Sequence, residues 1–268
     1  MKISFSTLGC PKWHWKEILA AAADLNYDGI ELRGLGNTMF MPRAEIFSPS
    51  KFEQTNAELK KRNVEISCIT SDILLHKDGM YYLSATLQYI ALAHDLDCKY
   101  IRMLADENPW PSDEVEYDLV LSRLRKVAPV ANALGVVLLV ESNGVFADTK
   151  LLRKLILDVN SPAVKVLWDI NHPVRYYNES PAETYANIGE FVCHIHVKDS
   201  IIENGKIKYK MLGYGDLPIN ECFALLKSHG FDGFVSLEWT KRWNAELEDA
   251  GVVFSQFAHA ARQLWKNA

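Results

Sequence analysis

Short apolar runs alternate with longer amphipathic stretches along the whole chain, and this alternation constrains the fold more than any other feature of the sequence. The apolar runs are rich in Val, Ile, Leu and aromatic residues, which is typical of buried strands. Each run is followed by a polar turn and then by a stretch with helical periodicity. The eight runs that predict strands cover residues 2–6, 29–33, 64–70, 100–104, 136–141, 164–169, 191–197 and 233–238.

The amphipathic stretches predict eight helices between and after these strands. They cover residues 15–26, 51–63, 83–97, 116–135, 149–159, 181–190, 219–230 and 252–268. Asp148, Ser50 and Ser180 are residue types that cap helices, and each stands next to a predicted helix start. Pro181 suits the first helical position after Ser180.

Alternating strands and helices favour parallel pairing, because a crossover helix is what joins two parallel neighbours. Eight such units in 268 residues predict an α/β fold, a (β/α)8 TIM barrel that forms a single domain over residues 1–268. A doubly wound sheet usually has a Gly-rich phosphate turn after its first strand, and the segment STLGCPKWHW lacks G-x-G-x-x-G. The longest connections, 34–49 and 199–217, follow the second and seventh predicted strands, on the side where barrels keep their active sites.

Charge and cysteine usage narrow the class of protein. The net charge is −5 and the acidic residues are scattered, so the basic surface typical of nucleic-acid-binding proteins is lacking. Five cysteines lie far apart without a CxxC pair, which favours a reducing cytoplasm over a disulfide framework. No stretch reaches the roughly 18 apolar residues of a membrane span, and MKISFSTLGC lacks a signal-peptide pattern. We therefore expect a soluble, cytoplasmic protein that binds neither nucleic acid nor a membrane.

Four residues of the kinds that bind metal ions stand at the ends of consecutive predicted strands. Glu141 and Asp169 end the fifth and sixth strands, His196 lies near the end of the seventh, and Glu238 ends the eighth. Because the C-terminal ends of barrel strands meet at one rim, we expect the four side chains to converge. Any one of them alone is more often a helix cap or a solvated loop residue. Their occurrence on four consecutive strands is hard to explain by solvation.

Three carboxylates and one imidazole suit a divalent metal ion. Without a cation, carboxylates this close would repel and raise one another's pKa values. The mainly oxygen donors fit an octahedral ion such as Mn2+, Mg2+ or Co2+ better than a thiolate-type zinc site. We expect one divalent metal ion as the cofactor, with Mn2+ favoured and Mg2+, Co2+ or Zn2+ as alternatives.

The seventh predicted strand carries three polar residues on one face. Side chains alternate along a strand, so His194, His196 and Lys198 point the same way. In a barrel this face points inward. We expect His194 to be a structural histidine deep in the barrel, His196 to reach the ion and Lys198 to lie at the mouth. Aromatic residues of the predicted rim loops are expected to fill the core or cover the barrel end rather than hold a sugar. They are Trp13, Trp15, Trp110, Trp239 and Trp243.

Several segments resemble the xylose isomerase-like barrel superfamily, in particular its sugar phosphate isomerase/epimerase branch. The segments are GIELRG, VESNG, LWDINHP, HIHVKDS and GFVSLEW, and the likeness extends over nearly the whole chain. The resemblance implies that one divalent ion is held by Glu141, Asp169, His196 and Glu238, with the second of the two histidines as the ligand. It also implies an isomerase, in which Glu141 and Glu238 act as acid and base on opposite faces of the reacting carbon through a metal-stabilised enediolate.

The resemblance further implies a small carbohydrate as the substrate. His172, Lys198 and Arg102 are the candidates for contacts with its hydroxyl groups or for stabilising oxyanion charge. Arg33 also faces the site in this interpretation, although exposed salt bridges at the rim explain Arg33 and Arg102 nearly as well. Barrels of this kind often associate, so a homo-oligomer is a further expectation.

Other functions are compatible with the same barrel. One is a metal-dependent lyase or dehydratase acting on a keto-sugar or keto-inositol, and another is a non-catalytic sugar-binding barrel. The apurinic-site endonucleases share the four ligands but add histidines for a trinuclear zinc site, and the second and fourth predicted strands lack such histidines. Many relatives carry a histidine after the glutamate of the fifth strand, where this chain has Ser142, Asn143 and Gly144. Substrate identity therefore stays open.

Overall fold

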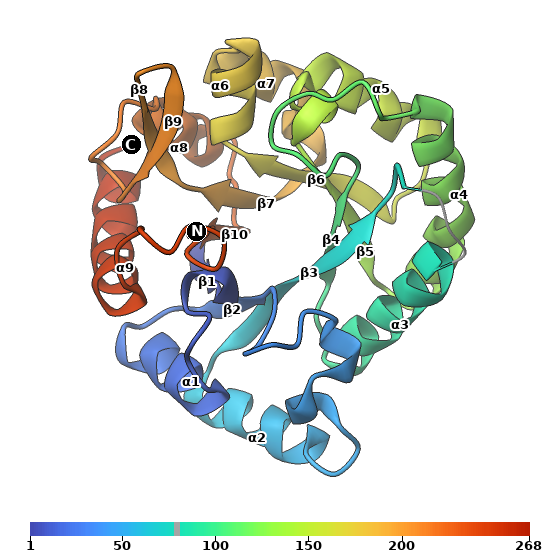
Figure 1. The fold of residues 1–268 in the computed structure, drawn as a ribbon, viewed down its shortest axis with the longest axis vertical. Coiled ribbons are helices and arrows are strands. Elements are labelled where there is room, and N and C mark those ends of the chain that lie inside the picture. The colour runs from blue at the N-terminus through green and yellow to red at the C-terminus, as the bar shows by residue number, and fades with distance from the viewer. Residues whose placement is uncertain (78–80) are drawn as a thin grey trace.

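The computed structural model, which describes residues 1–77 and 81–268, is built around a closed barrel of parallel strands (Figure 1). The strand order around the barrel is β1-β10-β7-β6-β5-β4-β3-β2, with helices packed around the outside. The predicted (β/α)8 fold is therefore confirmed. The barrel strands are β1 Lys2–Ser6, β2 Gly29–Leu32, β3 Glu65–Leu74, β4 Tyr100–Leu104, β5 Val137–Glu141, β6 Val164–Asp169, β7 Val192–Val197 and β10 Phe234–Leu237.

The helices follow the predicted alternation closely, with one addition. Their bounds are α1 Trp15–Asp24, α2 Phe52–Arg62, α3 Tyr81–Asp95, α4 Tyr117–Ala133, α5 Thr149–Val159, α6 Asn171–Tyr177, α7 Pro181–Ile188, α8 Ile219–Ser228 and α9 Ala250–Asn267. The short helix α6 was not predicted. It begins directly after β6, where the Asp169 carboxylate accepts a hydrogen bond from the amide of Asn171 at 2.8 Å. The carboxylate at the end of β6 thus accepts a hydrogen bond from the first amide of α6, which favours a helix directly after the strand.

Two of the three predicted helix caps are confirmed. The Asp148 side chain accepts from the amides at positions 150 and 151, and the Ser180 hydroxyl accepts from the amide of Glu183. The expectation for Ser50 is wrong, because α2 begins at Phe52 and no side chain caps it. The backbone carbonyl of Ser48 instead accepts from the amides at positions 51 and 52, because a preceding 3-10 turn leads directly into the helix.

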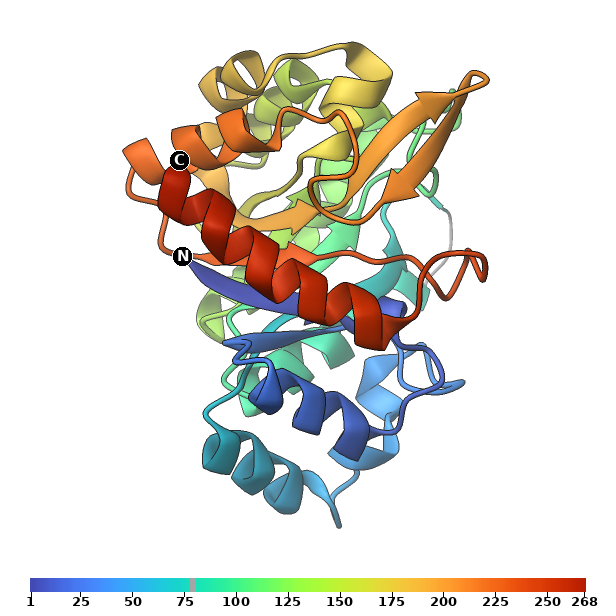
Figure 2. The same cartoon turned by 90° about the vertical axis from the view of Figure 1, so that its left-hand side faces the viewer.

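The long connection after β7 contains a hairpin that the sequence interpretation left as an irregular loop. Strands β8 (Asp199–Glu203) and β9 (Lys206–Lys210) pair in antiparallel register. Asn204 and Gly205 form the turn, both with positive φ, which is the geometry of the common two-residue hairpin turn. An Asn-Gly pair between two β-like runs was therefore the signal available in the sequence. Figure 2 shows the hairpin standing out from one end of the barrel.

Apolar residues among those that the structure describes form two cores. The main core lies between the strands and the helices, where Phe5 of β1 stacks on Phe254 of α9 at 4.1 Å between ring centroids. The second core is a small cluster of Cys68, Leu139 and Leu167. Strand alternation puts the two leucines on the inward face that also carries the carboxylates two residues further on. This cluster therefore closes the barrel interior beneath a polar upper layer.

All five cysteines are free thiols. In residues 1–77 and 81–268, no helix has both the length and the apolar content needed to cross a membrane.

Candidate active site

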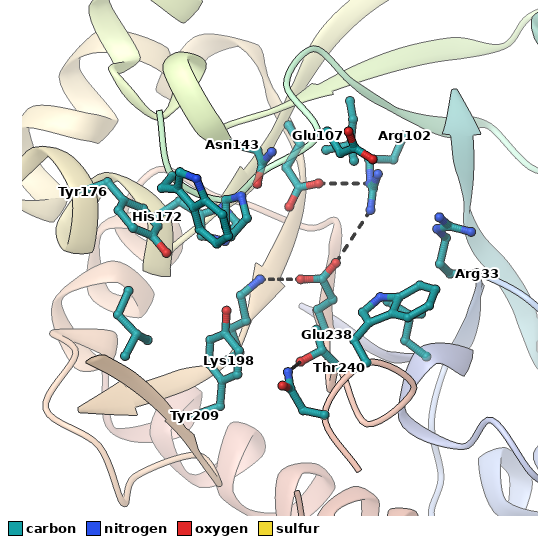
Figure 3. Close-up of a pocket in the computed structure, with 18 of the residues that line it drawn as sticks. Arg33, Arg102, Glu107, Asn143, His172, Tyr176, Lys198, Tyr209, Glu238 and Thr240 are labelled. Carbon is teal, nitrogen blue, oxygen red and sulfur yellow. Dashed lines mark hydrogen bonds and ion pairs between the residues drawn. The ribbon is translucent and has the colours of Figure 1, made fainter. Parts of the chain in front are cut away.

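A cavity of about 820 Å³ opens at the C-terminal end of the barrel (Figure 3). Its floor is formed by side chains from the ends of β4, β5, β7 and β10, and part of its wall comes from the β8–β9 hairpin. The polar and aromatic residues that line it include Arg33, Asp72, Arg102, Glu107, Trp110, Glu141, Asn143, His172, Tyr176, Lys198, Tyr209, Glu238 and Trp243.

The four metal-ligand candidates lie together, and two of them, Glu141 and Glu238, line this cavity. Each offers one ligand atom, these atoms all lie within 4.8 Å of one another, and all four residues are buried. The barrel register explains part of this convergence, because Asp169 of β6 lies directly beside His196 of β7. Glu141 ends the next strand on one side, and Glu238 follows the end of the strand on the other side. The group is Glu141, Asp169, His196 and Glu238.

The imidazole of His196 lies between two sets of carboxylates. Its Nδ1 atom is 3.3 Å from Glu141 Oε1 and 3.5 Å from Glu238 Oε1. Its Nε2 atom is 3.0 Å from both carboxylate oxygens of Glu31. Burial disfavours the charged imidazole, but the surrounding carboxylates outweigh burial and raise the pKa of His196 well above its ordinary value. The ring is thus fixed with Nδ1 toward the other ligand candidates and Nε2 toward Glu31.

Glu31 on β2 is a site residue that the sequence interpretation missed. It is fully buried, lies 2.9 Å from His194 Nε2, and accepts a 2.9 Å hydrogen bond from the Thr70 hydroxyl. Burial disfavours its ionised form, but the two imidazoles hold the pKa of Glu31 well below its ordinary value. A glutamate between Ile30 and Leu32 was the available signal, because alternation puts it on the inward face of an otherwise apolar strand.

His194 and His196 therefore share Glu31 but differ in what else they contact. His194 belongs to a second group of ligand-type residues, with Glu31 and His196, and lies outside the four-residue group. Burial lowers the pKa of His194, although its hydrogen bond with Glu31 opposes this shift. The two histidines occupy successive inward positions of β7, and the deeper one is hydrogen-bonded inside the barrel.

Arg102 and Lys198 are buried cations that lie against the carboxylates. Arg102 Nε is 3.0 Å from Glu141 Oε2, and its Nη2 atom is 3.8 Å from Glu238 Oε1. Lys198 donates to Asp169 Oδ2 and Glu238 Oε2. Burial disfavours the charged amine, but these two carboxylates raise the pKa of Lys198 well above its ordinary value. Arg102 is thus a buried partner rather than an exposed rim residue, and Lys198 reaches deeper than the mouth position expected for it.

His172 lies at the start of α6 with its ring facing the cavity. Its Nδ1 atom is 3.1 Å from the carbonyl oxygen of Ser142, and a carbonyl only accepts, so Nδ1 carries the proton. Burial lowers the pKa of His172, which favours the neutral ring. Its Nε2 atom, 3.8 Å from Asp169 Oδ2, is then a hydrogen-bond acceptor. This geometry suits contact with a hydroxyl group.

A buried clamp holds together the loops that follow β4 and β5. The Asp106 carboxylate accepts from the amides of Asn108, Ser112 and Val145, each at 3.2 Å. Asn143, where many relatives carry a histidine, donates from Nδ2 to the carbonyls of Asp106 and Asn108 at 2.9 and 2.8 Å. Gly144 has φ of +57° and packs directly against the Asp106 side chain. The Asn-Gly pair after Glu141 therefore fixes the loop that carries Trp110.

The tryptophans of the rim divide into two groups. Trp239 is fully buried and donates to the carbonyl of Glu248 at 3.0 Å, while Trp13 and Trp15 pack against the main core. Trp110 and Trp243 line the cavity with 54% and 60% of their surface exposed. The expectation that these tryptophans fill or cover the core is confirmed for the first three. The last two, Trp110 and Trp243, provide aromatic surface at the cavity.

The charges at the inner end of the cavity fit one divalent cation. Four buried carboxylates meet two cationic side chains there; one negative charge is in excess with His196 protonated, as its raised pKa implies, and two are in excess once a metal ion takes the place of that proton. The carboxylates are Glu31, Glu141, Asp169 and Glu238, and the cations are Arg102 and Lys198. Buried charges need compensation, and three carboxylate oxygens with one imidazole nitrogen are a common donor set for divalent ions. The residues present therefore fit the metal ion that the sequence predicts.

Comparisons with known proteins agree with this architecture. The sequence model of the xylose isomerase-like TIM barrel family matches residues 19–255. An uncharacterized protein of Methanocaldococcus jannaschii is 24% identical over 213 residues, which cover 76% of this chain and 64% of that protein. The chain thus spans less than two thirds of the length of this relative.

Three solved structures share the barrel over nearly its full length at low sequence identity. The IOLI protein with a bound zinc atom has a TM-score of 0.82 and 14% identity, covering 100% of this chain and 99% of that one. The probable 3-DHS dehydratase AsbF of Bacillus anthracis has a TM-score of 0.77 and 19% identity, covering 98% and 99%. The 3-keto-D-glucoside 4-epimerase YcjR of E. coli has a TM-score of 0.76 and 16% identity, covering 98% and 99%.

Proposed function

The chain belongs to the xylose isomerase-like TIM barrel family, and we propose that it is a divalent-metal-dependent isomerase or epimerase of a sugar or sugar phosphate. One observation carries this proposal. Two buried glutamates from opposite sides of the ligand group, Glu141 and Glu238, approach the same nitrogen of His196 at 3.3 and 3.5 Å. A pair of carboxylates beside one metal position can remove a proton next to a carbonyl and return it.

The metal ion would be held by Glu141, Asp169, His196 and Glu238. When bound, it would polarise the substrate carbonyl and stabilise the negative charge that develops on its oxygen. The oxygen-rich donor set favours Mn2+, with Mg2+, Co2+ and Zn2+ as alternatives. The zinc atom reported for the IOLI barrel supports a divalent ion in this fold.

The two glutamates would exchange a proton with the carbon next to the carbonyl. Burial opposes ionisation of Glu141, but the positive charges of Arg102 and His196 hold its pKa below the ordinary value, so it is a carboxylate able to accept a proton. One glutamate would remove the proton and the other would return it. Return to the same carbon from the opposite face inverts that centre, and return to the neighbouring carbon gives the isomer.

Other cavity residues would position the carbohydrate. The unprotonated Nε2 of His172 would accept a hydrogen bond from a substrate hydroxyl, and Lys198 and Arg102 would donate to substrate oxygens. Arg102 also contacts both glutamates, which keeps their carboxylates apart from each other and oriented. Trp110 and Trp243 would cover apolar faces of the sugar.

Deuterium exchange tests the reaction. The protein supplied with Mn2+ is incubated in D2O with a broad panel of ketoses and their phosphates, and the products are read by mass spectrometry and NMR. We expect deuterium at a carbon next to the carbonyl, and loss of that uptake in Glu141→Gln and Glu238→Gln. Absence of uptake across the panel would contradict the proposal. A new ultraviolet chromophore with loss of water would indicate a dehydratase instead.

Metal content tests the ligand assignment separately. His196→Ala is expected to lose the metal, because its Nδ1 atom belongs to the four-residue group. His194→Ala is the matched control, because it shares Glu31 but lies outside that group. Elemental analysis of the two purified variants gives the result. Equal metal retention in both would show that the ligand assignment on β7 is wrong.

A further inference from the structure

Arg33 is a cavity residue whose guanidinium lacks a direct partner within the part of the chain that the structure describes. It follows β2 and lines the cavity, and Figure 3 shows it across the cavity from Tyr176 and Tyr209, on the same side as Arg102. Its Nη1 atom is buried and has no hydrogen-bond partner among residues 1–77 and 81–268. It also forms no ion pair in that part of the chain. The described residues therefore do not hold Arg33 in the exposed salt bridge that the sequence offered as an alternative explanation.

The backbone at Arg33 is held in place. Its amide donates to the hydroxyl of Thr7 at 2.8 Å, and this hydroxyl donates to the carbonyl of Gly34 at 2.8 Å. Gly34 has φ of +92°, and a Cβ atom there would lie 2.6 Å from the sulfur of Met39. A left-handed, tightly packed glycine thus fixes the turn immediately after Arg33. The guanidinium group is presented to the cavity from a rigid support.

The groups that face Arg33 leave its guanidinium without a direct ionic contact in the described residues. The negative charges of Asp72 and Glu238 act on Arg33 from a distance, but neither carboxylate forms an ion pair with it in residues 1–77 and 81–268, and Asp72 accepts a 2.9 Å hydrogen bond from the Tyr89 hydroxyl instead. Burial and the like charge of Arg102 lower the pKa of Arg33 to about 10, so it remains cationic near neutral pH. The Nη1 atom of Arg102 is likewise buried without a hydrogen-bond partner in the described residues. Two guanidinium groups on one wall therefore have unused donors.

A half-buried cation with a buried donor that lacks a partner is stabilised by a ligand that contacts it directly. Neutral hydroxyl groups satisfy donors but do not compensate the charge, whereas carboxylate and phosphate groups do both and match the planar guanidinium. The buried cations of the cavity, Arg102 and Lys198, already lie against carboxylates. Among these three cations, Arg33 is thus the one that has no carboxylate in contact in the described residues and can bind an anionic group.

We propose that Arg33, with the free Nη1 of Arg102, binds an anionic carboxylate or phosphate group on the substrate, away from the carbon that reacts at the metal. This inference rests on the proposed function, because it assigns the substrate class of the same cavity. It restricts the substrate from carbohydrates in general to sugar acids or sugar phosphates.

Binding to three matched probes tests the proposal without any need for turnover. D-Fructose, D-fructose 6-phosphate and D-fructuronate differ at the sixth carbon, which is neutral, phosphorylated or a carboxylate. Isothermal titration calorimetry with the full chain supplied with Mg2+ gives their dissociation constants at fixed ionic strength. The variants are Arg33→Met, Arg33→Gln and Arg33→Lys. Lys206→Met is the control, because Lys206 is an exposed cation of the same cavity.

We expect the wild type to bind at least one anionic probe about tenfold or more tightly than fructose, as charge-assisted hydrogen bonds provide. Arg33→Met and Arg33→Gln are expected to lose that preference while keeping their affinity for fructose. Arg33→Lys should restore part of it, and Lys206→Met should retain it. Preference for the phosphate or for the carboxylate identifies which anion is used, and both outcomes support the proposal.

The proposal is overturned if the wild type binds all three probes alike, or if both neutral variants keep the anion preference. It is also overturned if Lys206→Met loses the preference as fully as Arg33→Met, because the effect would then reflect a diffuse positive field. Deuterium uptake is scored separately. Loss of anion binding in Arg33→Met without any uptake in the wild type would leave the anion site standing and contradict the isomerase.

Discussion

Replacing Gly144 by alanine should damage the clamp between the loops after β4 and β5. Gly144 has φ of +57°, and an added Cβ atom would overlap the side chain of Asp106. The buried carboxylate must then move, because it is the neighbour in direct contact. Its hydrogen bonds to the amides of Asn108, Ser112 and Val145 are weakened when it does so.

The size of the effect follows from two contributions. An alanine in the left-handed region costs roughly 1–2 kcal/mol relative to glycine. Losing three amide hydrogen bonds of about 1 kcal/mol each adds about 3 kcal/mol. Gly135→Ala isolates the first contribution, because Gly135 has φ of +71° and, apart from its own chain neighbours, no atom of the described residues lies within 4 Å of an added Cβ. We therefore expect Gly144→Ala to lower the free energy of unfolding by about 3 kcal/mol more than Gly135→Ala.

Urea unfolding followed by circular dichroism measures both variants. A double-mutant cycle with Asp106→Ala sharpens the result, because removing the carboxylate should abolish the extra cost of Gly144→Ala. If Gly144→Ala and Gly135→Ala were equally destabilising, or if the cycle showed no coupling, the clamp would contribute nothing and the reasoning would fail.

Three further outcomes are expected. Glu31→Gln should weaken metal binding about tenfold, because it disturbs the contact that orients His196, and competition with a fluorescent chelator measures this; unchanged affinity would contradict the role of Glu31. Mn2+ at a hundred times its dissociation constant should raise the free energy of unfolding by about 2.7 kcal/mol, an increase that EDTA removes and that His196→Ala lacks. Burial raises the pKa of Cys10 and of Cys98 to about 12, so both thiols should stay unreactive toward iodoacetamide at pH 8 until the protein unfolds; rapid labelling of either in the native state, read by peptide mass spectrometry, would refute this.

The strands, the barrel and the four ligand candidates were accessible from the sequence because their signals are local. Glu141 and Asp169 end apolar runs, and alternation along β7 distinguishes His194, His196 and Lys198 from their neighbours. The barrel closure then brings the strand ends together without further information. The Asn-Gly turn of the β8–β9 hairpin was equally local and was overlooked.

Contacts between distant positions were not accessible in this way. Glu31 meets His196 across 165 positions of sequence, and only the closed barrel brings β2 opposite β7. Lys198 points toward Asp169 because of how the long side chains pack in the buried part of the site. Strand alternation does not determine that packing. The missing partner of Arg33 is likewise a property of the assembled cavity, because an arginine after a strand is more often solvated.

The β8–β9 hairpin gives the cavity a wall that the barrel does not need for closure. Its residues pair only with each other in the sheet topology, yet Lys206, Ile207 and Tyr209 line the cavity. Insertions and exchanges in such a segment change the loop-closure entropy only slightly. Exchanges in the hairpin can therefore reshape one wall of the cavity while the barrel strands and strand ends that carry the four carboxylates and His196 stay as they are.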